Sequence, residues 1–347
     1  MKAVGFHTSL PIENEAALVD LDLPTPVPGP RDLLVRVQAV SVNPVDTKVR
    51  ARVAPAEGQP HILGYDAAGL VEAVGPEVRL FRPGDAVFYA GALSRPGTNA
   101  ELHCVDERIV GHKPAALSAA EAAALPLTAI TAWEALFDRL DVGKPVPGAA
   151  RSILIIGGAG GVGSIATQLA RQLTDLIVIT TASRPETAAW SRDLGAHHVI
   201  DHSKPLATEV AGLGLGAPGF VFSTTSTDRH LTEIAELIAP QGRFALIDDP
   251  DSLDVMPFKR KSVSTHWEFM FTRSMFSTTD MEAQGQLLDE VARLVDAGRL
   301  KTTPGRAFRT DLGRQPAPCP RLDRERTGQG QDRSGGLGMT GRSPSTA

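Results

Sequence analysis

The chain has 347 residues, of which 42% are hydrophobic and 22% charged, as is usual for a globular protein large enough for two domains. Its formal net charge of -5 and pI near 6.0 argue against binding to nucleic acid or to a membrane surface. Because Cys104 and Cys319 are far apart, and no signal peptide or membrane-length apolar run is present, we expect a cytoplasmic protein without a disulfide framework.

The first third of the chain is typical of an antiparallel β domain. Short alternating segments at 33–40 and 69–74 are separated by turns rich in proline and glycine, such as 26–30 and 82–85. Alternation with a period of two indicates strands that bury one face.

An Ala-rich segment with helical spacing follows at 118–141, and strand and helix patterns then alternate to about residue 300. This order predicts an α/β fold with a doubly wound parallel sheet. The expected strands are 153–156, 176–180, 198–201, 220–223 and 243–247, with an amphipathic helix at 227–239. Trp267, Phe269 and Phe271 alternate with other residues and predict an edge strand with one apolar face.

A glycine-rich turn lies between the strand at 153–156 and the helical pattern after it. Gly158, Gly160 and Gly163 fit the pattern G-x-G-x-x-G, which in this context predicts a dinucleotide site. The first glycine would allow the tight turn, the second the approach of a pyrophosphate, and the third the packing of helix on strand. The alternative is a glycine-rich turn that binds no ligand.

The segment after the second strand bears on which dinucleotide binds. At 180–185 no carboxylate stands where an NAD enzyme would place one, and Ser183 and Arg184 could donate to a phosphate. We therefore predict NADPH. In the alternative interpretation, Ser183 is a simple helix cap and Arg184 is solvated.

Several motifs together resemble the medium-chain dehydrogenase/reductase superfamily, within it the zinc-independent quinone oxidoreductase branch labelled zinc-type alcohol dehydrogenase-like. They are the segments 40–48, 63–69, 74–85, 125–133 and 258–264 together with the glycine turn, and the match covers residues 1 to about 304. The resemblance implies a GroES-like substrate domain at 1–120, a Rossmann NADP-binding domain at 121–304, an active site in the cleft between them, and a homodimer.

The resemblance also bears on zinc. Alcohol dehydrogenases of the superfamily carry a cysteine where this chain has Asn43, and Gly-His-Glu where it has Gly64-Tyr65-Asp66. The cysteine-rich lobe for a structural zinc is missing as well. Asp66 and His61 could meet at a metal, but both residue types are more often structural. We predict no metal site.

Without a Lewis acid, reduction of a quinone or an α,β-unsaturated carbonyl needs hydride delivery and weak polarisation of the carbonyl. The resemblance places Asn43, Asp46, Tyr65 and Thr131 near the nicotinamide, with Tyr65 or a water as hydrogen-bond donor. Each residue also has a structural interpretation. Asn43 could form a turn, Asp46 could cap a helix, Tyr65 could pack, and Thr131 could bond back to its own turn.

Further cofactor contacts are expected at the turn and at the carboxyl ends of the strands. His202 occupies a position where relatives often have tyrosine near the cofactor phosphate, although an exposed loop histidine is equally compatible. The complete predicted set is Gly158, Gly160, Gly161, Val162, Gly163, Ser183, Arg184, His202, Ser223, Thr224, Thr225, Leu246 and Ile247.

Residues 305–347 show neither helical nor strand periodicity, and their composition predicts a disordered tail. Relatives instead finish with a helix and a strand. Reading Phe308 to Leu337 one nucleotide late, with permissible codons, produces an amphipathic helix followed by a strand, and Met339-Thr340 then contains a stop codon. We hypothesise that a one-nucleotide frameshift near 304–306 replaced the native ending.

Taken together, these patterns predict an NADPH-dependent, zinc-free oxidoreductase that reduces quinones or α,β-unsaturated carbonyls. A 2-alkenal or enoyl thioester reductase is one alternative. A second is a protein that binds NADPH without turnover, as a redox sensor or a structural protein.

Overall fold

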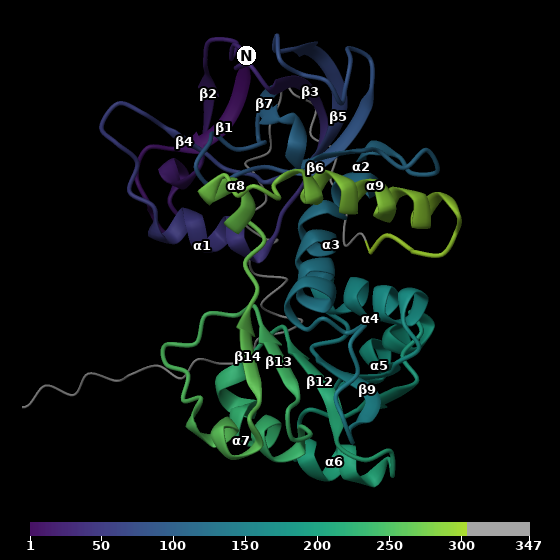
Figure 1. Cartoon of the computed structure of the whole chain (residues 1–347). Coiled ribbons are helices and arrows are strands. Elements are labelled where there is room, and N and C mark those ends of the chain that lie inside the picture. The colour runs from purple at the N-terminus through teal and green to yellow at the C-terminus, as the bar shows by residue number, and fades with distance from the viewer. Residues whose placement is uncertain (304–347) are drawn as a thin grey trace, which may run out of the picture.

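The computed structural model describes residues 1–303, which form an N-terminal half built on antiparallel sheets and a second half built on one parallel sheet (Figure 1). The N-terminal half has a three-stranded sheet of order β2-β1-β4 and a five-stranded sheet of order β7-β3-β5-β6-β8. Its strands are β1 Lys2–Phe6, β2 Val19–Asp22, β3 Asp32–Ser41, β4 His61–Ile62, β5 Asp66–Val74, β6 Ala86–Ala90, β7 Leu102–Asp106 and β8 Val110–His112.

The alternation seen in the sequence accounts for the five-stranded sheet. The segments predicted at 33–40 and 69–74 lie within β3 and β5, which pair antiparallel. Leu33, Val35 and Val71 point into the core of this half, as a half-buried sheet requires. The helices of this half are η1 Glu15–Ala17, α1 Pro44–Arg52 and η2 Glu107–Ile109.

The second half contains the predicted parallel sheet, with the strand order β11-β10-β9-β12-β13-β14. The strands are β9 Ala150–Ile156, β10 Ile177–Thr181, β11 His198–Ile200, β12 Pro218–Ser223, β13 Arg243–Leu246 and β14 Ser264–Trp267. The helices are α4 Gly161–Leu173, α5 Pro185–Asp193, α6 Leu206–Gly212, α7 Thr227–Leu237 and η4 Met256–Lys261. The strand order reverses at β9, so the sheet is doubly wound, and ligands of such sheets bind at the carboxyl ends of the strands beside the reversal.

The predicted edge strand is present but shorter than expected. β14 ends at Trp267, and the prediction that Phe269 and Phe271 share one apolar strand face with it is wrong. The neighbouring strand β13 ends at Leu246. The Glu268 N–H donates to the Leu246 carbonyl at 3.0 Å, and this is the last hydrogen bond that continues the pairing of the two strands. Beyond that point the Thr272 N–H bonds back to the Phe269 carbonyl, so the chain turns into α8.

The Ala-rich segment at 118–141 forms three consecutive helical pieces between the halves. They are α2 Ala119–Ala123, α3 Pro126–Trp133 and the π-helix η3 Glu134–Arg139. Pro126 starts a new helix because proline lacks the N–H that would continue α2 and is favoured in a first turn. All of α3 from Pro126 to Ala132 is buried, and Figure 1 shows it standing between the two sheets.

After β14 the chain returns to the N-terminal half through α8 Thr272–Phe276 and α9 Glu282–Asp296. α9 packs against β8 and η2, and Figure 1 shows α8 and α9 beside the strands of the N-terminal half. One buried apolar cluster runs through both halves and includes Phe88, Ile130, Ile153 and Leu288. The domain limits 1–120 and 121–304 stay predictions.

The predicted disordered tail at 305–347, the frameshift hypothesis and Cys319 lie outside the described residues. Within residues 1–303, no helix is both long enough and apolar enough to span a membrane.

Candidate functional site

The glycine turn joins β9 to α4 at the point where the sheet order reverses. Gly157 has a φ of 82°, a conformation that residues with a Cβ rarely adopt. The Gly160 N–H bonds back to the Gly157 carbonyl at 3.0 Å, and Gly160 is the N-cap of α4. The turn thus presents the N-terminus of a thirteen-residue helix, where free N–H groups and the helix dipole favour an anion.

The three glycines of the pattern differ in how much space surrounds them. A Cβ on Gly158 would lie 2.5 Å from the Thr180 Cβ, and one on Gly163 would lie 2.2 Å from the Gly157 carbonyl oxygen. A Cβ on Gly160 would lie 3.3 Å from that oxygen, and Gly160 is exposed. Gly158 and Gly163 are therefore needed for packing, whereas Gly160 leaves room on the outer side of the turn.

The residue that makes the tight turn is Gly157, not Gly158 as the sequence pattern predicts. The pattern can start only at Gly158, because residue 159 is alanine, and it contains no information on Gly157, which directly precedes it. The sequence does not reveal which glycine has a positive φ, because that depends on where β9 ends.

Side chains at the ends of neighbouring strands support this turn. The Gly157 N–H donates to Thr181 Oγ1 at 3.0 Å, and Thr181 Oγ1 lies 3.1 Å from His202 Nδ1. Thr224 Oγ1 donates to the Ile156 carbonyl at 2.8 Å. The structure thus brings His202 and Thr224 to the glycine turn, and it adds Thr181, which the sequence patterns did not single out.

The other predicted strand-end residues differ in how accessible they are. Ser223 is buried and accepts a bond from Thr227 Oγ1 at 2.8 Å, and Leu246 is buried in the apolar core. Thr225 and Ile247 are half-buried. The side chains of Ser223 and Leu246 therefore have structural contacts, so a role toward a ligand would fall to their backbone.

Ser183 and Arg184 follow β10 and are both exposed. The N-cap of α5 is Arg184, not Ser183, and its side chain makes no capping bond. Burial lowers the pKa of the nearby His202, Asp201 opposes this effect, and the positive charge of Arg184 adds to it. A cationic side chain therefore stands beside the predicted phosphate site.

The residues predicted to face the nicotinamide form a second group, which is assembled around Asp66 at the start of β5. Asp66 is fully buried, and its Oδ2 accepts a bond from the Asn43 amide nitrogen at 2.8 Å. Its Oδ1 accepts the Leu127 N–H at the start of α3, at 2.7 Å. Asp66 thus joins Asn43, next to α1, to the helix that carries Thr131.

Most of the structural interpretations of these residues are realised as contacts. The Asn43 N–H donates to Asp46 Oδ2 at 2.7 Å, so Asp46 caps α1. Thr131 Oγ1 donates to the Leu127 carbonyl at 2.8 Å, one turn back on α3. Tyr65 is buried and packs edge-on against Phe271, with ring centroids 5.1 Å apart.

The environment of these side chains sets their protonation. Burial, with a smaller contribution from the Asp46 charge, raises the pKa of Tyr65 far above its ordinary range. Tyr65 is therefore a neutral phenol over the physiological range and can act as a hydrogen-bond donor. Burial also raises the pKa of Asp66 well above the ordinary value, against the effect of its two N–H donors.

The glycine turn and the second group meet at α3. A Cβ on Gly161 would lie 3.1 Å from Thr128 Cγ2, and Thr128 stands one turn before Thr131. A ligand lying along the N-terminus of α4 would therefore extend toward the residues grouped around Asp66.

The donor set does not fit a zinc ion. Within the described part of the chain, no three or more His, Cys, Asp or Glu side chains are grouped so that they could hold a metal. Both oxygens of Asp66 face N–H donors, and the His61 ring packs against Phe6 at a centroid distance of 5.3 Å. Cys104 is a free thiol in β7.

A cavity of about 180 Å³ lies away from these residues. It is lined from β7 and from α8 and its following turn, by residues that include Arg95, Cys104 and Ser277. None of the predicted site residues borders it.

Two family models match the chain, one for each half. The alcohol dehydrogenase GroES-like domain matches residues 29–131, and the zinc-binding dehydrogenase domain matches residues 161–288. The chain is 40% identical over 310 residues to a zinc-type alcohol dehydrogenase-like protein of Staphylococcus aureus, covering 89% of this chain and 92% of that protein.

Solved structures agree with these matches. A Rhizobium etli protein, described as a proposed zinc-dependent alcohol dehydrogenase, has 69% identity and a TM-score of 0.86 over 87% of this chain and 88% of its own. A quinone oxidoreductase of Pseudomonas syringae has 30% identity and a TM-score of 0.72 over 86% of this chain and 90% of its own. The chain therefore belongs to the medium-chain dehydrogenase/reductase superfamily, with a GroES-like half and a Rossmann half.

Proposed function

We propose that this protein is an NADPH-dependent oxidoreductase that reduces quinones or α,β-unsaturated carbonyls without zinc. The observation that carries the proposal is the junction at α3, where Gly161 of the nucleotide-type turn lies against Thr128 while Asp66 ties Asn43 to the same helix. The similarity to a quinone oxidoreductase of Pseudomonas syringae supports the same class of reaction.

The residues present fit a dinucleotide. The exposed corner at Gly160 and the N–H groups of Gly161 and Val162, which have no partner within α4, would hold the pyrophosphate. Arg184 would pair with a 2′-phosphate, since a guanidinium forms charge-assisted bonds to phosphate. When bound, the nicotinamide supplies a hydride.

The chain's own residues would orient the carbonyl substrate. Tyr65 keeps its proton at neutral pH and can donate a hydrogen bond to a carbonyl oxygen. Asn43 and Thr131 are fixed by bonds to Asp66 and Leu127, which holds this polar group in one arrangement. Tyr65 is the donor for the carbonyl, because the Thr131 hydroxyl already donates its only proton to the Leu127 carbonyl. A donor held in one arrangement is what polarisation of a carbonyl requires in the absence of a Lewis acid.

The test uses the purified full-length chain, first depleted of metal with a chelator. We expect oxidation of NADPH with a benzoquinone or a 2-enone, unchanged by the chelator and much slower with NADH. Preferential turnover of a 2-alkenal or an enoyl thioester would assign the enzyme to those substrates. Tight NADPH binding with no turnover of any of these compounds would show a non-catalytic binding protein, and activity that requires added zinc would refute the zinc-free mechanism.

We also propose a homodimer formed through the second half. β14 is an edge strand of the six-stranded sheet, and Trp267 at its end is 53% exposed. Light scattering of the wild type and of Trp267→Lys tests this, and a wild type that is monomeric at micromolar concentration would refute it.

A further inference from the structure

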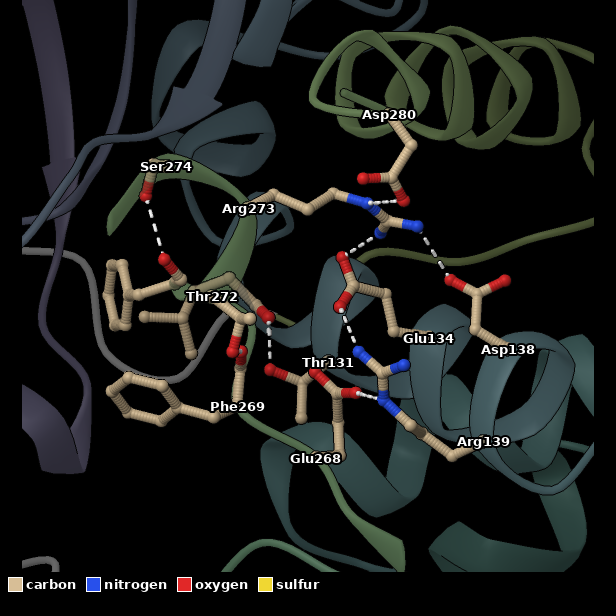
Figure 2. Close-up of polar contacts among 12 residues, drawn as sticks. Thr131, Glu134, Asp138, Arg139, Glu268, Phe269, Thr272, Arg273, Ser274 and Asp280 are labelled. Atoms are coloured by element: carbon tan, nitrogen blue, oxygen red, sulfur yellow. Dashed lines mark hydrogen bonds and ion pairs between the residues drawn. The ribbon is translucent and has the colours of Figure 1, made fainter. Parts of the chain in front are cut away.

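A cluster of charged side chains has no part in the proposed function and lies next to the residues predicted to face the substrate. The π-helix η3 contributes Glu134, Asp138 and Arg139, and the chain that leaves β14 contributes Glu268, Arg273 and Asp280 (Figure 2). The side chains of Glu134 and Glu268 are 0% exposed, and that of Arg273 is 10% exposed. Buried charges are costly unless they are paired, so this cluster calls for an explanation.

Arg273 is held by carboxylates from two directions. It bonds to Glu134, to Asp138 at 2.9 Å and to Asp280 at 3.0 Å. Arg139 bonds to Glu268 at 2.9 Å and lies 3.7 Å from Glu134 Oε2. Figure 2 shows Glu134 between the two guanidinium groups. The cluster therefore fastens the segment 268–273 to η3.

One carboxylate oxygen of each buried glutamate lacks a hydrogen-bond partner within the described part of the chain. Among the residues described, no N–H or hydroxyl group donates to Glu134 Oε2 or to Glu268 Oε1. Both carboxyl groups lie against the Arg139 guanidinium, with Glu268 Oε2 at 2.9 Å and Glu134 Oε2 at 3.7 Å, and each shifts the pKa of the other. Two carboxylates cannot share a buried contact while both are ionised, so the pair must keep one proton.

The surrounding charges agree with a retained proton. Two guanidinium groups face four carboxyl groups, and those of Asp138 and Asp280 are partly exposed to water. Burial lowers the pKa of His266, on β14, and the positive charges of Arg243 and Arg139 lower it further. Burial, followed by the charge of Glu134, raises the pKa of Glu268 to about 9.

The position of the pair connects it to the site. Glu268 begins the segment that crosses from the parallel sheet to α8, and Phe271 in that segment packs against Tyr65. Glu134 continues the helix of Thr131, one turn further on. π-turns within helices often occur at functional sites. The pair therefore lies directly behind two residues predicted to face the substrate.

We propose that Glu134 and Glu268 are positioning residues, which share one proton, fasten the crossing segment 268–273 to η3 and thereby hold Phe271 against Tyr65 on the substrate side. Loss of the proton would leave two adjacent buried anions, and the crossing segment would loosen. The expected effect on the KM for the substrate rests on the proposed function. Whether the attachment of segment 268–273 to η3 depends on the shared proton can be measured without any substrate.

The test compares the wild type with Glu268→Gln, Glu268→Ala and the control Glu290→Gln. The glutamine keeps an N–H donor toward Glu134 at every pH and has no proton to lose. Glu290 is paired with Arg293 on α9, outside the cluster. Trp133 and Trp267 directly precede Glu134 and Glu268, so tryptophan fluorescence reports on the pair, and hydrogen exchange of peptides covering 268–276 reports on the segment.

In the wild type and in Glu290→Gln we expect a fluorescence transition near pH 9. Above it, exchange at 268–276 should speed up by more than the base-catalysed increase with pH that all peptides share. The KM for the quinone should rise at least about fivefold across the same transition, with kcat little changed. Glu268→Gln should lack the transition and keep the low KM, whereas Glu268→Ala should exchange fast already at neutral pH.

A transition that persists in Glu268→Gln, or its absence from a folded wild type between neutral pH and pH 10, would overturn the proposal. So would faster exchange confined to segments other than 268–276. If no quinone or enone is reduced at all, the proposed function fails while the fluorescence and exchange measurements still decide on the proton-sharing pair. If Glu268→Ala does not fold, Glu268→Gln alone decides.

Discussion

Replacing Gly160 with alanine separates ligand binding at the glycine turn from its packing. Gly160 is exposed, has a φ of -72° that alanine tolerates, and has 3.3 Å between the position of a Cβ and the nearest backbone oxygen. Its place at the N-cap of α4 is where a pyrophosphate would approach the backbone. A methyl group there would occupy the space of a phosphate oxygen and leave the protein folded.

The expected magnitudes follow from these contacts. Alanine is a poorer N-cap than glycine, so Gly160→Ala should lower the free energy of unfolding by about 1 kcal/mol. The affinity for NADPH should fall at least about tenfold, which corresponds to about 1.4 kcal/mol. In contrast, Gly163→Ala would place a Cβ 2.2 Å from the Gly157 carbonyl oxygen, a backbone atom that no rotamer change can move away. We expect that variant to lose about 3 kcal/mol of stability from overpacking.

The assay is a titration of NADPH fluorescence on each variant, combined with urea unfolding. Gly143→Ala is the matched control, because within residues 1–303 no atom beyond its two chain neighbours lies within 4 Å of the new methyl group, and its φ is not positive. If Gly160→Ala remains folded and binds NADPH as tightly as the wild type, the turn does not hold the phosphates at this corner. The assignment of the nucleotide site would then be refuted.

Three further predictions concern charged residues. Arg184→Ala should weaken binding of NADPH about tenfold and leave NADH unchanged, and equal losses for both in a fluorescence titration would contradict a 2′-phosphate contact. Because burial raises the pKa of Glu268 from 4.5 to about 9, the native state holds a proton that the unfolded chain releases. Between those pH values the free energy of unfolding of the wild type should fall, relative to that of Glu268→Gln, by about 1.4 kcal/mol per pH unit as the pH rises. Urea unfolding measures this difference, and the same pH dependence in both proteins would contradict the prediction. Asp66→Asn should cost about 2 kcal/mol, because its amide must oppose an N–H donor of Asn43 or Leu127, and unchanged urea unfolding would show that these bonds are unimportant.

The sequence predicted the parts of the fold that depend on local periodicity. Buried strands such as β9 and β12 are short apolar runs between turn residues, and a glycine turn that follows one of them can be recognised without the structure. The role of Gly157 was beyond this kind of reasoning. The pattern starts at Gly158, because residue 159 is alanine, and only the backbone conformation shows that the residue before the pattern makes the tight turn.

The buried charges could not be predicted for a different reason. Glu134 and Glu268 are 134 positions apart in the sequence, and each looks like an ordinary surface charge next to an aromatic residue. The same region misled the strand prediction, since the aromatic alternation from Trp267 to Phe271 continues past the end of β14. Asp66 was noticed as a candidate ligand, but its two N–H partners come from distant segments.

One helix face relates these separate observations. Leu127, Thr131 and Glu134 follow one another at spacings of four and three residues, so they lie on one side of the continuous helix formed by α3 and η3. The N–H of Leu127 belongs to the first turn, where helix donors lack internal partners, and Asp66 both accepts it and complements the helix dipole. At the other end of this face, Glu134 meets Glu268 and Arg273. The network around Asp66 and the shared-proton pair thus hold the same helix from its two ends, with Thr131 between them. Perturbing either end should displace Thr131, and we therefore expect the effects of Asp66→Asn and Glu268→Ala on KM to be less than additive in a double-mutant cycle, because residues that act through one element are coupled.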